Sequence, residues 1–243
     1  MALFLSLAAV GVVYSVVAPS STAQDAPVSA DVQAGQELFE VGCITCHGRN
    51  LQGVEDRGPS LIGVGEAAVY FQVGTGRMPA AGQGAQINRK APVYDDDEVA
   101  QLAAYIQANG GGPELPTEGD LRDGDLSEGG ELFRLNCASC HNFAGQGGAL
   151  SSGKAAPSLN LSSDLDIYTA MLSGPQNMPV FGDNQLTPED KRAIINYVQT
   201  LNESQDPGGA GIGRAGPVPE GLVIWVAGIT ACLFACVWIG SKS

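Results

Sequence analysis

Residues 43–47 read Cys-Ile-Thr-Cys-His, and residues 137–141 repeat the pattern as Cys-Ala-Ser-Cys-His. Both stretches are C-x-x-C-H, the pattern typical of covalent haem c attachment. On a helix, positions i, i+3 and i+4 share one face, so two thiols and one imidazole converge on the same flat ligand. The thiols bond the haem vinyl groups, and the imidazole ligates the iron. The chain has 2 histidines, and each of them closes one motif.

The motifs therefore predict two covalently bound haem c groups. The predicted attachment residues are Cys43, Cys46, Cys137 and Cys140, and the predicted proximal iron ligands are His47 and His141. A four-cysteine zinc site and a pair of thiol–disulfide redox motifs are the alternatives. A zinc site usually gathers its cysteines closer in sequence, whereas 90 residues lie between Cys46 and Cys137. A redox C-x-x-C needs no histidine directly after it, so haem is favoured.

The distal iron ligands are sought among the 4 methionines, because no histidine is left over. Met78 and Met178 each precede a proline and each follow a glycine by four residues. Met171 is better explained by core packing on a helix, where its counterpart in the repeat is Phe71. The predicted axial pairs are His47/Met78 and His141/Met178. Thioether ligation closes the iron and raises its reduction potential, which suits electron transfer.

Two prolines that follow the haem motifs, Pro59 and Pro157, are candidates for orienting the proximal histidines. A ligating imidazole usually donates its second N–H to a carbonyl, which fixes the tautomer and the ring orientation. An ordinary loop proline is the alternative for each position. Arg57 and Arg77 are candidate partners of haem propionates, with solvated surface positions as the equal alternative.

The haem motifs lie within a longer internal repeat. Residues 130–133 resemble residues 36–39, and residues 174–179 resemble residues 74–79. The repeat predicts two tandem copies of one small all-α domain. Each copy has a helix before the haem motif and a closing helix at its end. Leu38 and Val41 lie at helical spacing ahead of the first motif.

The closing helices carry recognisable start signals. Asp95 with Glu98 fits a capping box, and the closing helix of the second copy has Thr187 as its N-cap residue. A buried stripe is predicted for the first closing helix, formed by Val99, Leu102, Ala103 and Ile106.

Two apolar segments flank the repeat. Residues 221–240 are 20 uncharged residues, long enough as a helix to cross a bilayer, with Trp225 and Trp238 near its two ends. Lys242 follows directly, so the positive-inside rule predicts a cytoplasmic C-terminus and haem domains on the extracytoplasmic side of the plasma membrane. Residues 2–18 carry no charge and are interpreted as an uncleaved anchor, with a signal-peptide core as the alternative.

The predicted organisation divides the chain into seven segments. They are an N-terminal transmembrane segment (1–18), a linker (19–30), a first haem domain (31–112), a linker (113–124), a second haem domain (125–203), a linker (204–219) and a C-terminal transmembrane helix (220–241). The formal charge of −14 argues against nucleic acid as a partner, because phosphates need cationic side chains.

Each domain resembles a class I cytochrome c, with C-x-x-C-H after a helix, a Pro-x-Leu segment, a Met-Pro loop and a closing helix. The whole chain resembles the dihaem cytochrome cc subunits of actinobacterial menaquinol–cytochrome c reductases. The stretches that carry this resemblance are residues 50–54, 57–61, 135–143 and 174–179. The chain departs from that family at its N-terminus, where the family has a basic segment.

This resemblance implies a role and a set of partners. Such subunits take electrons from the Rieske iron–sulfur protein of a complex that also contains a b-type cytochrome. They pass the electrons to the copper centre of a haem-copper oxidase in the same supercomplex. Two other functions remain open: a cytochrome subunit of a periplasmic dehydrogenase, and a dihaem peroxidase. A peroxidase needs one iron that can open to peroxide, so a methionine on both irons argues against it.

Overall fold

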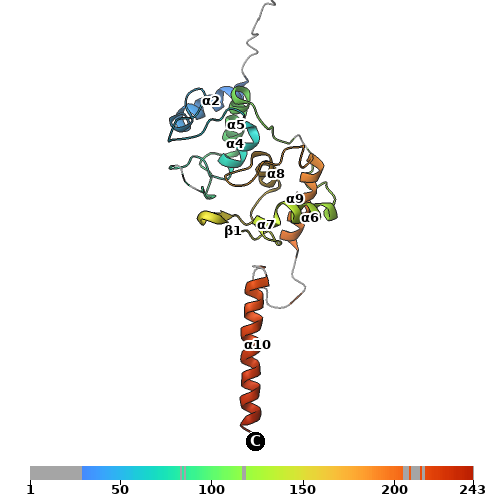
Figure 1. Ribbon diagram of the computed structural model, residues 1–243. Helices are drawn as coiled ribbons and strands as arrows, with labels where there is room; N and C mark the ends of the chain where they lie inside the picture. Colours follow the sequence, from blue (N-terminus) through green and yellow to red (C-terminus); the bar gives the residue numbers. More distant parts are fainter. Residues whose placement is uncertain are drawn as a thin grey trace, which may run out of the picture. The chain divides into compact units, whose positions relative to one another are not determined.

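The computed structural model describes residues 29–82, 84, 86–116, 119–204, 208, 214 and 217–242. The apolar segment predicted as a first anchor, residues 1–18, lies outside this part of the chain. Figure 1 shows that the described elements are almost all helices, with one short hairpin. The all-α fold class predicted from the repeat is confirmed.

The first domain is built from four helices around one hydrophobic core. They are α2 (Ala30–Gly42), α3 (Ile44–His47), α4 (Gly65–Gly74) and α5 (Asp96–Gly110). The predicted stripe of α5 is buried, with each of its four residues 2% exposed. Leu51, Phe39 and Val69 complete the same core. The core therefore joins the helix before the haem motif to the closing helix.

The second domain repeats this plan with a small addition. Its helices are α6 (Leu126–Asn136), α7 (Ala138–His141), α8 (Asp164–Ser173) and α9 (Pro188–Glu203). Between α7 and α8 lie β1 (Gly148–Ala149), the 3-10 helix η1 (Ser151–Gly153) and β2 (Ala155–Ala156). The strands pair antiparallel, with Gly148 opposite Ala156. The first domain has a single bridge, Val54 with Gly58, at the corresponding place.

The predicted helix starts are present as hydrogen bonds. Asp95 accepts a bond from the Glu98 backbone N–H at 2.9 Å, and the Glu98 carboxylate accepts one from the Asp95 N–H at 3.0 Å. Thr187 and Asp190 form the equivalent box at the start of α9. Each box satisfies N–H groups that have no partner within the helix, so capping accounts for these acidic residues.

One position in the helix before the first haem motif differs from the expected pattern. The helix is present as α2, but Val41 is 89% exposed, whereas Phe39 is 1% exposed. Leu38 packs partly buried against the core. The aromatic side chain takes the core position because its ring meets Tyr105 of α5, with the centroids 5.3 Å apart.

The helix before each haem motif crosses the closing helix at a glycine. A Cβ at Gly35 would collide with the backbone oxygen of Gln101, and a Cβ at Gly129 would collide with that of Ala193. Beside each crossing lies an aromatic pair: Phe39–Tyr105 in the first domain, and Phe133–Tyr197 in the second, with centroids 5.5 Å apart. The two domains therefore use the same helix crossing.

Replacing Gly129 by alanine is expected to destabilise the second domain by about 1–3 kcal/mol, because the new methyl group meets rigid backbone rather than a flexible side chain. For a domain of this size, each 1 kcal/mol lowers the unfolding midpoint by about 4–8 °C. Thermal melting of the full chain in detergent measures it. The control is Gly74→Ala, where a Cβ would lie 4.0 Å from the nearest side-chain atom. Equal midpoints for both variants would contradict this account of the crossing.

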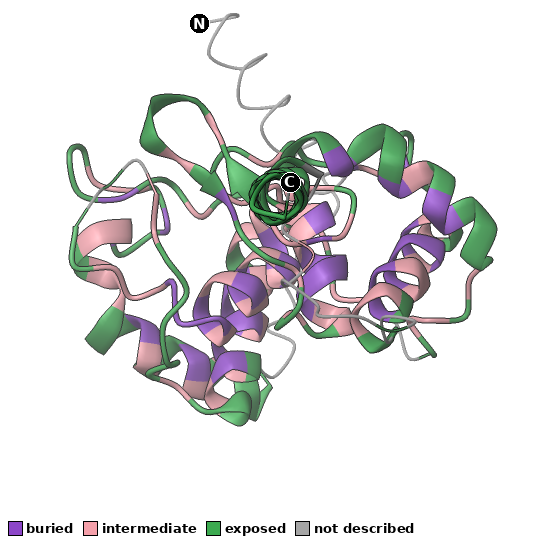
Figure 2. Cartoon of the chain, turned by 90° about the horizontal axis from the view of Figure 1, so that it is seen from below, coloured by how far each residue is buried: buried purple, intermediate pink, exposed green. Residues whose placement is uncertain are grey.

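The C-terminal helix α10 (Pro217–Gly240) is the span predicted from hydropathy, beginning three residues before residue 220. In the part of the chain that the structure describes, Val218–Gly240 is long and apolar enough to cross a membrane. Figure 2, which looks along α10, shows it exposed all round, whereas the other long helices each have a buried face. Its large apolar side chains are exposed, Trp225 to 65% and Trp238 to 64%. This exposure is what a lipid-facing helix requires.

The two domains contact each other through equivalent helices. α4 of the first domain packs against α8 of the second. Phe71 of α4 occupies the position in the repeat that Met171 occupies in α8. Further contacts come from the first-domain segment 86–89, which bonds to second-domain residues in β2, between β2 and α8, and in α8. This contact decides the shape of the site described next.

Candidate haem sites

Both C-x-x-C-H motifs wind as one helical turn after the helix that precedes them. In the second domain the Cys137 N–H donates to Phe133 O at 2.8 Å, and the His141 N–H donates to Cys137 O at 2.9 Å. The corresponding bonds of the first domain, from Cys43 and His47, measure 2.9 and 3.0 Å. This backbone places the two cysteines and the histidine of each motif on one face, as the spacing predicts.

Each motif histidine is held by the proline that the sequence singled out. His47 Nδ1 donates to the carbonyl oxygen of Pro59 at 2.8 Å, and His141 Nδ1 donates to that of Pro157 at 2.9 Å. A carbonyl only accepts, so the proton is on Nδ1, and Nε2 keeps the lone pair that binds a metal. Burial lowers the pKa of His141, although the bond to Pro157 opposes the shift. A neutral imidazole with a fixed ring is the form that ligates iron.

The first thiol of each motif does not have the character of a redox cysteine. Burial, followed by the neighbouring motif cysteine, raises the pKa of Cys43 to about 11 and that of Cys137 to about 12. Redox C-x-x-C motifs work through a thiol whose pKa is lowered. Among the described residues, which include all four motif cysteines, no group of three or more metal-binding side chains gathers. The four motif cysteines are therefore not gathered as a four-cysteine zinc site would require.

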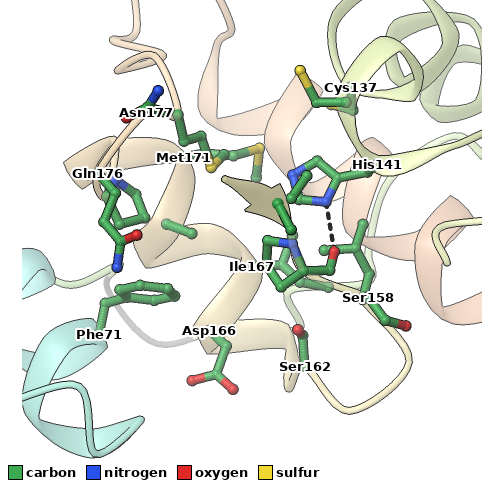
Figure 3. A pocket seen from close by; sticks show the side chains of 18 of the residues that line it. Phe71, Cys137, His141, Ser158, Ser162, Asp166, Ile167, Met171, Gln176 and Asn177 are labelled. Carbon is green, nitrogen blue, oxygen red and sulfur yellow. Dashed lines mark hydrogen bonds between the residues drawn. The ribbon is translucent and has the colours of Figure 1, made fainter. Parts of the chain in front are cut away.

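The second-domain motif opens onto a cavity of about 390 Å³. This is within the range of about 300–1,000 Å³ for small-molecule and cofactor sites. Figure 3 shows Cys137 and His141 on one side of the cavity, with the bond from His141 to the proline carbonyl. Apolar side chains line much of the rest, including Ile167, Leu159 and Phe181. An apolar cavity with two thiols and an oriented imidazole fits a covalently attached haem.

Two methionines reach this cavity, not one. Met178 and Met171 both line it, and the Met171 side chain is visible in Figure 3. Met171 is 1% exposed and belongs to the core cluster, whereas Met178 is partly buried against that cluster. Core packing of Met171 is thus present, as the sequence suggested. Met178 remains the predicted iron ligand, because its first-domain counterpart is a methionine and that of Met171 is Phe71.

In the first domain the equivalent residues pack against one core. Met78 and Cys43 are partly buried against the cluster that contains Phe39 and Leu102. The Met78 N–H donates to Gln72 O at 2.8 Å, which holds the Met-Pro loop against the end of α4. Of the arginines proposed for propionates, Arg57 is exposed and Arg77 is 9% exposed. Arg77 lies at the second-domain cavity.

Sequence reasoning named Arg77 as a propionate candidate but did not predict that the first domain contributes to the second-domain cavity. The first-domain residues that line it are Phe71, Arg77 and the segment 86–89. One signal for them was available: 27 residues separate Met78 from Tyr105, but only 19 separate Met178 from Tyr197. The first domain therefore has eight more residues between its Met-Pro loop and its closing-helix tyrosine. The length of this loop does not predict which surface the loop covers, because that depends on how the two domains pack.

Comparison with known proteins places both domains among the cytochromes c. Residues 32–109 match the family described as "Cytochrome c", and residues 124–198 match "Cytochrome C oxidase, cbb3-type, subunit III". The chain is 53% identical over 232 residues to the "Cytochrome bc1 complex cytochrome c subunit" of Mycobacterium leprae, covering 93% of this chain and 80% of that protein. It is 51% identical to the protein of that name from Corynebacterium efficiens, over 100% of this chain and 88% of the relative.

The helix crossings, the C-x-x-C-H turns and the proline-bound histidines define a c-type cytochrome with two domains and a C-terminal helix fit for a membrane anchor. It is an electron carrier that binds haem c covalently. By its near full-length similarity, the chain belongs to the family of cytochrome bc1 complex cytochrome c subunits.

Proposed function

We propose that this chain is the dihaem electron relay of a menaquinol-oxidising cytochrome bc-type complex. It takes electrons from the Rieske iron–sulfur protein and delivers them to the copper centre of a haem-copper oxidase in a supercomplex. The observation that most supports the proposal is its identity of 53% over 93% of its length to bc1 complex cytochrome c subunits. The catalytic work on the quinol belongs to partner subunits, including a b-type cytochrome.

Each domain holds one haem c, which supplies a one-electron iron couple when bound. Cys43 and Cys46 would attach the first haem, and Cys137 and Cys140 would attach the second. His47 and His141 would supply imidazole ligands to the irons, oriented by the carbonyls to which their Nδ1–H groups donate. Met78 and Met178 would supply thioether ligands. Iron held by both an imidazole and a thioether would suit electron transfer rather than peroxidase chemistry.

The orientation of α10 determines on which side of the membrane the haem domains lie. α10 spans the bilayer, and Lys242 lies beyond its last turn at the cytoplasmic surface. The haem domains then lie on the extracytoplasmic side of the plasma membrane, where quinol-oxidising complexes release electrons to their acceptors. A tethered carrier depends less on charge steering than a diffusing one, which is compatible with the net charge of −14.

A mild-detergent purification through a C-terminal tag tests the assignment. We expect a b-type cytochrome, a Rieske protein and oxidase subunits to copurify with the tagged chain. Addition of a reduced menaquinone analogue should reduce the c-type haems, and a Rieske-site inhibitor should block that reduction. Copurification with a quinoprotein or flavoprotein dehydrogenase in place of these subunits would overturn the proposal. Peroxide turnover with a five-coordinate haem would assign the chain to the peroxidases.

A further inference from the structure

One wall of the second-domain cavity belongs to the first domain. Gln86 binds the backbone of Ala155 twice, accepting from its N–H at 2.8 Å and donating to its carbonyl at 2.9 Å. Gln176 of the second domain donates to Ile87 O at 2.7 Å. Arg89 donates to Leu161 O at 3.1 Å. These bonds fix the segment 86–89 across the cavity, and this segment lies in the longer loop of the first domain.

The charged residues that line this cavity are mostly cationic. They are Arg77, Arg89 and Lys154, against the single carboxylate of Asp166. The chain as a whole has 12 Lys and Arg residues against 26 Asp and Glu residues, so its cavity lining reverses the balance of the chain. A haem brings two propionate carboxylates, and the excess of two cations matches that charge.

The two arginines both line this cavity and have different partners there. Arg89 Nη1 lies 3.2 Å from Asp166 Oδ2, whose side chain is 9% exposed. Arg77 stacks over the Phe71 ring at 4.6 Å and donates to Thr75 at 2.6 Å. The ring and the hydroxyl are both neutral, so an anion at this place would offset the positive charge of the Arg77 guanidinium.

The positions of the thioether bonds determine how the haem would be oriented in the cavity. In haem c the thioether bonds are on one edge of the macrocycle and the propionates are on the opposite edge. Figure 3 shows Cys137 at one end of the cavity, and Phe71 and Asp166 at the other. The arginines are at that far end, because Arg89 contacts Asp166 and Arg77 covers Phe71. The propionate edge therefore faces the first domain.

We propose that Arg77 and Arg89 of the first domain bind the propionates of the haem attached to the second domain. The second haem site is then completed across the domain contact, and its reduction potential depends on a loop of the first domain. Guanidinium groups beside the propionates favour the reduced iron, which has one positive charge fewer. This inference rests on the two haems of the proposed function.

Replacing Arg89 by glutamine tests the inference with the least risk to folding, because its side chain is 46% exposed. We expect about a tenfold fall in the equilibrium constant for reducing one haem, equal to about 59 mV for a one-electron couple. Spectroelectrochemical titration of the full chain measures it. The second haem is identified as the one whose potential also moves in Met178→Leu. Resonance Raman bands of the propionates should also shift in Arg89→Gln.

The matched controls separate this role from simple charge and from packing. Arg49→Gln removes the same charge from an exposed position of the first domain, outside the cavity lining, and should leave the second haem unchanged. Arg89→Lys should restore most of the potential. If two haems are present and Arg89→Gln changes neither the potential nor the propionate bands, the inference is wrong. If only one haem is bound to the unmodified chain, the dihaem assignment itself fails.

Discussion

Replacing Cys137 and Cys140 together by serine is expected to reduce the covalently bound haem from two per chain to one. The thioether bonds are the covalent link, so without the thiols the second haem has no attachment that survives denaturation. Intact-protein mass measured after unfolding in acid should fall by one haem, beyond the small change from the substitutions. The same loss should follow when Cys43 and Cys46 are replaced, because the repeat predicts one haem per motif.

The chain has its own control for this experiment. Cys232 and Cys236 lie in α10, are exposed, and belong to no C-x-x-C-H motif. Replacing both by serine removes the same number of thiols and should leave both haems attached. A zinc site would behave differently. The unmodified chain would carry no haem, and loss of either motif would release zinc. Retention of two covalent haems in the Cys137/Cys140 variant would contradict the attachment assignment.

Replacing Met178 by leucine is expected to open the sixth coordination position of the second haem. Loss of the thioether should lower that haem's potential by roughly 0.1–0.3 V, within the ~0.8 V range that axial ligands span. The absorption band that reports iron–thioether ligation should fall by half, because the first haem keeps Met78. Carbon monoxide should bind the reduced variant but leave the unmodified protein unchanged. Redox titration and absorption spectra of the full chain provide these measurements.

Met171→Leu is the matched control, because Met171 lines the same cavity and has the same side chain. Leucine for methionine in a packed core usually costs less than about 1.5 kcal/mol, so the control should fold and keep both methionine-ligated irons. If Met171→Leu loses the ligation band and Met178→Leu keeps it, the axial assignment is reversed. Both methionines reach the cavity, and each variant removes one of them, so this pair identifies which thioether ligates the iron.

In the proposed relay, the contact between the two domains would couple the two haems. If the propionates of the second haem are bound by Arg77 and Arg89, a displacement of the first domain changes the charge around the second iron. Asp166, whose side chain is 9% exposed, would then mediate between the arginines and the cap of α8, since it also accepts from the Ser163 N–H.

The amino-acid sequence alone was sufficient for features that depend on nearby residues. The two haem motifs, the capping box at Asp95, the N-cap at Thr187 and the apolar span of α10 are local patterns. Each is decided by spacing along one helix or by the side chain that caps it. The repeat extended this reasoning to the whole chain, because equivalent segments of two copies must fold alike. The all-α class and the two domains were therefore predictable from the sequence.

The tertiary structure decided which side chains meet across long separations. Val41 is exposed and Phe39 is buried because Phe39 meets Tyr105 of α5, a contact that spacing within α2 does not decide. Lys191 is fully buried on a polar helix turn because Asp183 and Leu186 O accept from its amine, at 2.6 and 2.7 Å. Arg89 reaches the second cavity because α4 packs on α8. Such contacts arise from the packing of whole elements, which no short sequence pattern encodes.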